Sequence, residues 1–220
     1  MSLQLEGINF NPPYVNTPLE TIFSYTMSQI NSGLEEFVPL HWNLNEDGTP
    51  GYVIKEGCSP KKDQYPLINW NSDKEDGYKG KPIDGLTFRA AWNRGGTAIG
   101  VRTGRRSRLY LFDFDYDASN TLPQFLDKVK DFLNNDQIYL ERTVSGGYHL
   151  IVKLDESERW DEKGDLRDEA FAYYPGVDKP VIESRGEGGM VFVAPSRGYR
   201  IIDGFAKSLV ELKPITRGDI

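Results

Sequence analysis

The chain has 220 residues, 38% of them hydrophobic and 12% aromatic, which is enough apolar material for a packed interior and excludes global disorder. Its single cysteine, Cys58, excludes an internal disulfide, and without a cysteine cluster no zinc is expected. No apolar run is long enough to cross a bilayer, and the N-terminus has no basic start followed by a hydrophobic stretch. We therefore expect a cytoplasmic protein with no membrane partner.

The charge is unevenly distributed along the chain. A net charge of −7 at pH 7 argues at first against a nucleic-acid partner. However, residues 88–109 contain no acid, whereas acids concentrate in residues 155–168. The basic stretch contains Arg89, Arg94, Arg102, Arg105, Arg106 and Arg108. It leads directly into an acidic strand end, and this juxtaposition is the first indication of a functional site.

The first half of the chain contains one clear helix signal and two strand signals. The TPLE motif at residues 17–20 predicts a capping box with Pro18 at the first helical position, and a helix that runs to about Asn31 and ends at Gly33. FVPLHW at residues 37–42 predicts a short buried strand. Residues 43–81, rich in Gly, Pro, Asn, Asp and Lys, predict a long irregular segment that is functional or mobile. GTAIGVRTG at residues 96–104 predicts a strand that leaves through a glycine turn.

The stretch LYLFDFDYD at residues 109–117 alternates with a period of two, which predicts a strand with two different faces. One face is aromatic, and the other begins with two leucines and ends with Asp113, Asp115 and Asp117. Neighbouring carboxylates repel one another, so a strand end of this kind is unfavourable without a compensating charge.

The second half predicts one helix and two hairpins. Residues 120–135 predict an amphipathic helix, and residues 155–172 a surface helix and loop. The apolar face of the helix holds Leu122, Phe125, Leu126, Val129 and Phe132. Residues 137–154 predict a hairpin around the turn SGGYH, and residues 179–196 predict a second one. This order of elements indicates a mixed α/β or α+β domain.

Three polar features end these β-elements: the Asp113/Asp115 pair, His149 and Glu183. Two carboxylates at i and i+2 on one strand face lie about 6–7 Å apart, within reach of shared divalent cations that would relieve their repulsion. Glu183 would complete an oxygen cage, and oxygen ligands suit Mg²⁺ or Mn²⁺. Such a cage supports two-metal phosphoryl transfer. The backbone N–H groups of Ser145, Gly146, Gly147 and His149 would then bind phosphate.

Each of these features also has a simpler interpretation. The acidic strand end could be a solvated end with an Asx turn, and SGGYH could be a tight turn capped by His149. Glu183 could pair with Arg185 on an edge strand, and the arginine-rich stretch could be a solvated loop.

Four segments occur in the order and spacing of a known family: GTAIGVRTG, LYLFDFD, ERTVSGGYHLIVKL and VIESRGEGGMVFVAPS. Together they resemble the primase-polymerase (prim-pol) catalytic domains of the archaeo-eukaryotic primase superfamily, of the bifunctional DNA primase/polymerase type found in phages, plasmids and mobile elements. The resemblance covers roughly residues 37–203, and FVPLHW followed by Trp70 is similar to the start of that family.

The resemblance implies an α+β fold, in which an α/β lobe is joined to an RRM-like lobe and the active site lies in the cleft between them. It also implies one catalytic domain over residues 1–220. We expect an N-terminal helix and extension over about 1–35, a catalytic core over about 36–205, and a tail or the start of a linker over about 206–220. Many relatives carry a zinc-binding element, which the cysteine count makes unexpected here.

The same resemblance assigns roles to individual residues. Asp113 and Asp115 match the family's first motif and would bind two metal ions, with Glu183 as the third acid, where the family more often has Asp. His149, in SGGYH, would contact the triphosphate of the nucleotide. Arg185 matches an arginine that often follows the third acid. Apart from the resemblance, Arg102, Arg105 and Arg106 are further candidates for holding the triphosphate, because arginine suits bidentate phosphate contacts, and Ser145, Gly146 and Gly147 are candidates through their backbone N–H groups. Asp117 lies outside the motif, and neither Tyr116 nor Tyr148 can be assigned as a sugar gate.

The resemblance therefore implies a template-dependent nucleotidyltransferase, a DNA primase, a DNA polymerase or both. It would join NTPs or dNTPs to a 3′-OH with two Mg²⁺ or Mn²⁺ ions. We expect single-stranded DNA template and primer as partners, a helicase domain or replication protein as a further one, a monomeric state, and a bacterial, archaeal or viral-host cytoplasm. Three rivals stay open: a metal-dependent DxD glycosyltransferase, a metal-dependent nuclease, and a non-catalytic RRM-like nucleic-acid-binding module.

Overall fold

The computed structural model describes residues 2–13, 16–43, 45, 51–53, 61–62, 64–75, 77–158, 166, 169–173, 176 and 180–219. They divide into two compact units. The first unit comprises residues 1–13, 102–191 and 200–220, and the second comprises residues 14–101 and 192–199. Cys58 and most of the acidic stretch, residues 159–165 and 167–168, lie outside the described residues. In the part of the chain that is described, no helix is long and apolar enough to cross a membrane.

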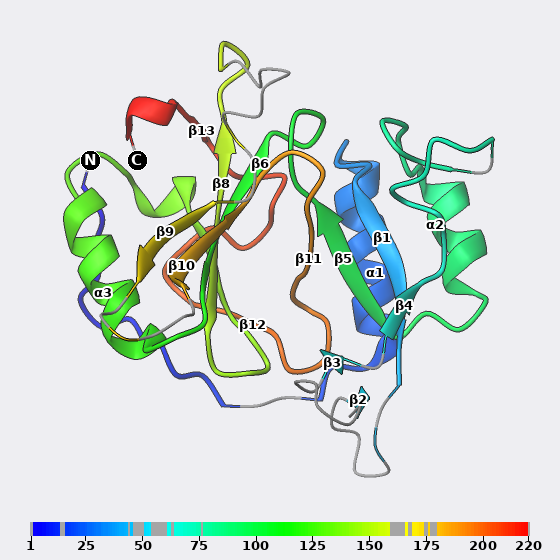
Figure 1. Ribbon diagram of the computed structural model, residues 1–220, viewed down its shortest axis with the longest axis horizontal. Helices are drawn as coiled ribbons and strands as arrows, with labels where there is room; N and C mark the ends of the chain where they lie inside the picture. Colours follow the sequence, from blue (N-terminus) through cyan, green and yellow to red (C-terminus); the bar gives the residue numbers. More distant parts are fainter. Residues whose placement is uncertain are drawn as a thin grey trace. The chain divides into compact units, whose positions relative to one another are not determined.

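The first unit is built on a sheet to which seven of the described strands belong, in the order β12-β7-β8-β6-β10-β9, with β13 paired to β8. The strands are β6 (Leu109–Phe114), β7 (Tyr139–Arg142), β8 (Tyr148–Leu154), β9 (Ala170–Tyr173), β10 (Pro180–Arg185), β12 (Arg200–Ile201) and β13 (Pro214–Ile215). The β13–β8 pair is parallel, and the pairs along the rest of the sheet that have a described register are antiparallel. Figure 1 shows β10 beside β9 at one edge of this sheet. The mixed α+β class predicted from the sequence is confirmed.

The two faces of this sheet differ as the alternation in β6 predicts. The aromatic side chains Tyr110, Phe112 and Phe114 belong to a buried core that also includes Leu122 and Leu126. Those two leucines come from helix α3 (Ala118–Val129), which covers this face. Because strand residues alternate between faces, Leu109, Leu111 and Asp113 point to the opposite side. The aromatic face therefore anchors the strand, and the other face presents the carboxylate.

Helix α3 is displaced from the predicted range of residues 120–135. It follows Asp117, whose φ of 49° lies in the left-handed region, and it ends at Val129. Phe132 lies beyond the helix and is 63% exposed, so its predicted place on the buried face is wrong. Leu133 takes the buried position after the helix end. The chain continues into a short 3₁₀ helix, η1 (Asn135–Gln137), and the described chain closes with another, η2 (Arg217–Asp219).

The first predicted hairpin is confirmed, because β7 and β8 pair antiparallel on either side of the SGG turn. The second is wrong. β10 pairs with β6 on one side and with β9 on the other, whereas β11 (Met190–Phe192) joins the sheet of β5. Both edges of β10 are thus taken, which leaves no edge for β11. Residues 170–172 belong to β9, so the loop or helix predicted there is wrong as well.

The second unit contains helices α1 (Leu19–Asn31) and α2 (Gly85–Trp92), strands β1 and β4 and most of β5, and these strands belong to a sheet in the order β11-β5-β1-β4. Its strands β1 (Phe37–Trp42), β4 (Gln64–Pro66) and β5 (Ala98–Arg102) are labelled in Figure 1. A short pair, β2 (Tyr52–Val53) and β3 (Lys61–Lys62), lies within the segment predicted as irregular. The strand predicted at residues 37–42 is confirmed as β1.

Helix α1 begins one residue later than the TPLE motif predicts. Pro18 is the N-cap with an extended ψ of 143°, and no side chain caps the helix, so the predicted capping box is wrong. Thr17 lies one residue too early to reach the free N–H groups of the first turn. The predicted end is confirmed, because the helix stops at Asn31 and Gly33 has a φ of +100°.

Candidate metal and nucleotide site

Four ionisable side chains form one row across the sheet of the first unit. Glu141 of β7 is the register partner of His149 of β8, which partners Asp113 of β6, which in turn partners Glu183 of β10. Directly opposed residues on neighbouring strands share a face, so all four side chains point away from the α3 core. Residues far apart in sequence are thereby brought into line. We refer to these four residues as the polar row.

A hollow of about 490 Å³ opens at this row. Its lining comprises Asp113, Asp115, Tyr116, Ser145, Pro180 and Glu183. The predicted strand over residues 109–117 stops at Phe114, so the exposed Asp115 belongs to the loop that follows rather than to the strand. The three carboxylates that the sequence proposes as metal ligands nevertheless line one and the same hollow.

Asp113 is the most constrained carboxylate of the three. Its side chain is 16% exposed, and Oδ1 is buried without a hydrogen-bond partner among the described residues. Burial raises the pKa of Asp113, as do the charges of Asp115 and Glu183, while His149 and Arg185 lower it. The ionised carboxylate is therefore unfavourable in the protein alone, and a bound cation would supply the missing partner. The residues present thus fit a divalent cation.

The carboxylate of Glu183 is already paired with another side chain. Its Oε2 lies 2.6 Å from a guanidinium nitrogen of Arg185, two residues along the same strand. Within the described ranges, no three acidic, histidine or cysteine side chains converge tightly enough to hold a metal ion as they stand. The ion pair that the sequence left open as an alternative is therefore present, and it occupies Oε2 of Glu183.

The SGG turn packs directly against the acidic loop. A Cβ added to Gly147 would lie 2.5 Å from the carbonyl oxygen of Phe114 and 3.0 Å from Oδ1 of Asp115. Gly146 has a φ of +90°, and its N–H donates to the carbonyl of Thr143. The N–H of Gly146 is thus already used within the turn. The Ser145 hydroxyl, 3.0 Å from that of Thr143, lines the hollow.

The arginines proposed from the sequence lie in different places. Arg185 adjoins the carboxylates, whereas Arg102 is buried at the end of β5. Arg105 and Arg106 belong to the exposed loop that Gly104 and Leu109 close by an isolated bridge. Arg105 lines a separate hollow of about 280 Å³ with Arg108, Asp155, Glu156 and Glu158. Four residues of strand, about 13 Å, separate Leu109 from Asp113, so a role of this loop in triphosphate binding stays a prediction.

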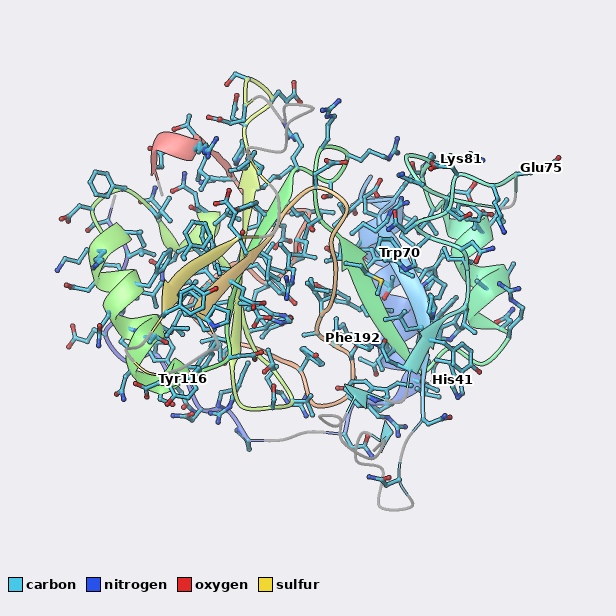
Figure 2. The ribbon with its side chains drawn as sticks, in the orientation of Figure 1. His41, Trp70, Glu75, Lys81, Tyr116 and Phe192 are labelled. Atoms are coloured by element: carbon cyan, nitrogen blue, oxygen red, sulfur yellow. The ribbon has the colours of Figure 1, made fainter. Side chains whose placement is uncertain are left out.

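The two tyrosines near the motifs lie in different environments. Tyr148 is buried on the core face, and its hydroxyl donates to the carbonyl of Phe10 at 3.0 Å. Tyr116, labelled in Figure 2, is 42% exposed and lines the hollow. The other histidine, His41, belongs to β1 of the second unit.

Glu141 is the member of the polar row that the sequence analysis missed. Its side chain is fully buried, and Oε1 lies 2.8 Å from Nδ1 of His149. The available signal was the alternation in QIYLERT, which places an acid in the middle of a strand that is otherwise buried. An acid at such a position requires a partner, because buried charges are paired in folded proteins.

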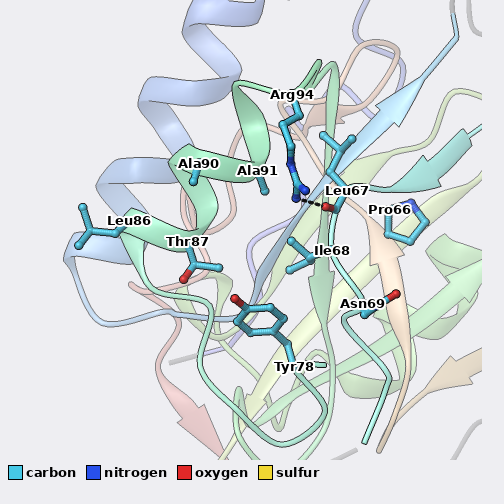
Figure 3. Close-up of a pocket in the computed structure, with 10 residues that line it drawn as sticks. All are labelled: Pro66, Leu67, Ile68, Asn69, Tyr78, Leu86, Thr87, Ala90, Ala91 and Arg94. Carbon is cyan, nitrogen blue, oxygen red and sulfur yellow. Dashed lines mark hydrogen bonds between the residues drawn. The ribbon is translucent and has the colours of Figure 1, made fainter. Parts of the chain in front are cut away.

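A larger hollow of about 710 Å³ lies in the second unit, between residues 66–69 and helix α2 (Figure 3). Among the described residues, its lining includes Tyr78 and Arg94 but no acid and no histidine. The guanidinium of Arg94 donates to the carbonyl of Leu67, as Figure 3 shows. This hollow lacks the groups that bind metal ions, so the polar row and its hollow are the candidate site.

One family model matches most of the chain. The family model described as the N-terminal domain of bifunctional DNA primase/polymerases, Prim-Pol, matches residues 32–215. The chain belongs to the Prim-Pol family. The match includes the whole polar row and the lining of its hollow. A search of the curated proteins finds no match for the chain.

Membership of the Prim-Pol family implies DNA primase or polymerase activity in the broad sense, with DNA and nucleotides as substrates. Prim-Pol enzymes are generally metal-dependent, which agrees with the oxygen-rich hollow. The mixed α+β architecture with antiparallel sheets is compatible with a Prim-Pol fold. The location of the active site in a cleft between an α/β lobe and an RRM-like lobe stays a prediction, as do the domain boundaries.

Proposed function

We propose that this Prim-Pol chain is a template-dependent nucleotidyltransferase that joins an NTP or dNTP to a 3′-OH and releases pyrophosphate. The observation that carries the proposal is the buried Oδ1 of Asp113, which accepts no hydrogen bond from the described residues and lies beside Asp115 and Glu183 in one hollow. A surface that only bound nucleic acid would gain nothing from three acids next to a phosphate site, because they repel phosphate.

The carboxylates of Asp113, Asp115 and Glu183 would hold Mg²⁺ or Mn²⁺, since hard divalent cations prefer oxygen ligands. When bound, the ions lower the pKa of the attacking hydroxyl and neutralise the leaving pyrophosphate. The protein contributes the position of the ligands. β6 and β10 are adjacent strands in register, so Asp113 and Glu183 are fixed with respect to each other.

His149 and Arg185 would bind the triphosphate. Nε2 of His149 lies on the site side of the ring, 3.7 Å from Oδ1 of Asp113. Arg185 provides a planar guanidinium, which suits bidentate contacts with phosphate oxygens. In the protein alone this guanidinium is paired with Glu183. Loading the site would exchange the partners of both residues, with Glu183 turning to the cation and Arg185 to the phosphate.

This exchange predicts that Arg185→Ala has opposite effects on the two ligands. Removing the guanidinium frees Glu183, so Mn²⁺ alone should bind more tightly, measured by calorimetry or by the paramagnetic effect of Mn²⁺ on water relaxation. The KM for the nucleotide should rise about tenfold or more, because a charged hydrogen bond is lost. Lys128→Ala, a matched loss of a surface cation on helix α3, should change neither value. Weaker Mn²⁺ binding in Arg185→Ala would contradict the exchange.

The proposed function is tested by incubating the protein with single-stranded template, with or without annealed primer, and labelled NTPs or dNTPs with Mg²⁺ or Mn²⁺. We expect nucleotide incorporation that weakens with added salt, since phosphate contacts dominate binding. The double change Asp113→Asn with Asp115→Asn should abolish it, and Asp117→Asn, a neighbouring acid outside the hollow, should retain it.

The rivals give different products in the same assay. A nuclease would shorten the DNA, and a binding module would shift its mobility without incorporation. A glycosyltransferase would leave DNA and nucleoside triphosphates unchanged and act on a nucleotide-sugar. Incorporation that survives the double change would refute the assignment of Asp113 and Asp115.

A further inference from the structure

The fully buried carboxylate of Glu141 belongs to β7, which pairs with β8 on one side and with the edge strand β12 on the other. Burying a carboxylate is unfavourable unless the charge is paired and hydrogen-bonded. Glu141 is absent from the lining of the hollow, so a direct contact with substrate does not account for it.

The contact of Glu141 with His149 has a defined geometry. Oε1 lies 2.8 Å from Nδ1, and a carboxylate can only accept, so Nδ1 carries a hydrogen and donates it. Donation from Nε2 to a phosphate oxygen requires a second hydrogen on the ring, as in the imidazolium form. On the other side of the ring, Nε2 lies 3.7 Å from Oδ1 of Asp113. The imidazole therefore bridges an interior carboxylate and a carboxylate of the site, and it is itself only 6% exposed.

We propose that Glu141 is a positioning residue that fixes the ring of His149 so that Nε2 faces the nucleotide triphosphate. The inference rests on the proposed function of the site. Turning the ring by 180° about its bond to Cβ would place a carbon against Oε1 of Glu141, and the hydrogen bond would be lost. The partner of one ring nitrogen thus determines the direction and the hydrogen of the ring, as it does for histidines in other sites.

The first test needs no turnover. The chain has two histidines, so the ring signals in long-range ¹H–¹⁵N NMR spectra of the metal-free protein can be assigned with His41→Gln and His149→Ala. We expect a downfield, slowly exchanging Nδ1–H signal from His149. It should persist in Glu141→Gln, whose amide oxygen still accepts, and disappear in Glu141→Leu. A His149 signal unaffected by Glu141→Leu would overturn the proposal.

The second test measures nucleotide KM and kcat in primer extension. Glu141→Leu should raise KM about tenfold, the effect of losing one hydrogen bond to a charged group, with a smaller change in kcat. Glu141→Gln should restore most of the affinity. In combination with His149→Ala, the Leu change should add nothing, because both act through one ring. Tyr139→Phe, a buried change on the same face of β7, should behave like the wild type.

Failure of the proposed function and failure of the positioning role of Glu141 give different experimental results. If the wild type incorporates no nucleotide, the proposed function fails, while the NMR test still decides whether Glu141 positions His149. If incorporation is observed but the effects of Glu141→Leu and His149→Ala multiply, the proposed function stands and the positioning role is refuted.

Discussion

Asp113→Asn is expected to abolish nucleotide incorporation and to stabilise the metal-free protein. The loss should be about 10³-fold or more, because a lost metal ligand removes several kcal/mol of charge stabilisation. Stability should rise because the amide removes a buried carboxylate whose Oδ1 has no hydrogen-bond partner among the described residues. A gain of about 1 kcal/mol would raise the Tm of a domain of this size by about 2–4 °C.

The stabilisation caused by Asp113→Asn is expected to increase as the pH rises. Burial raises the pKa of Asp113 above its ordinary value of 3.8, so folding favours the protonated form. That contribution is complete below pH 3.8 and is lost as the pH rises through the pKa of the folded state. The Tm difference between the Asn variant and the wild type should therefore widen as the pH rises from 3.8 through the pKa of Asp113 in the folded state, and it should stay constant at higher pH.

Asp115→Asn is the matched control for Asp113→Asn. Asp115 lines the same hollow but is exposed, so its variant should lose activity without gaining stability. Mn²⁺ should raise the Tm of the wild type and of neither variant, since a ligand that binds only the folded state stabilises it. A lower Tm of metal-free Asp113→Asn than of the metal-free wild type would contradict the view that the buried carboxylate of Asp113 destabilises the folded protein.

Gly147→Ala is expected to inactivate the protein through the loop that carries Asp115. The new methyl group would lie 2.5 Å from the carbonyl oxygen of Phe114, which is backbone and cannot turn aside. The acidic loop must therefore move away from the turn, and Asp115 with it. Overpacking of this kind costs about 1–3 kcal/mol, and we expect incorporation to fall about 100-fold or more, since a displacement of about 1 Å has that effect on positioned groups.

Gly204→Ala separates the loss of stability from the loss of geometry. Gly204 has a φ of +96°, and its added Cβ would lie 3.2 Å from the side chain of Ile8, so this change also destabilises the first unit. We expect both variants to show a lower Tm in differential scanning calorimetry, but only Gly147→Ala to lose activity well below its Tm. Equal activity of the two variants at that temperature would show that the SGG turn does not position Asp115.

The strands around the site could be predicted because their signals are local. The alternation in residues 109–114 shows which face of β6 is apolar, and the SGG turn marks the hairpin of β7 and β8. Element ends were less predictable. Helix α3 ends at Val129, although the apolar pattern of the sequence continues to Phe132. After the helix end Leu133 is buried and Phe132 is exposed, and the pattern alone does not show which of the two packs in the core.

The partners of strands could not be read in the same way. VIESRGEGGMVFVAPS has the pattern of a hairpin, yet β10 inserts between β6 and β9, and β11 joins β5. A strand pairs with whichever edge is available, and that depends on segments far away in the chain. The same limit explains why Glu141 was missed, since its partner His149 is defined by register across β7 and β8.

From the sequence alone the chemical kind of site can be predicted: acids at the end of an apolar strand, a histidine after a glycine turn, and an acid in a later strand, in an order that resembles the Prim-Pol family. Residue types and local periodicity carry that information. The row of Asp113, His149 and Glu183 with Glu141, and the ion pair of Glu183 with Arg185, are visible in the folded chain alone. The physical reason is that register, burial and ion pairing arise between strands, and no single segment contains them.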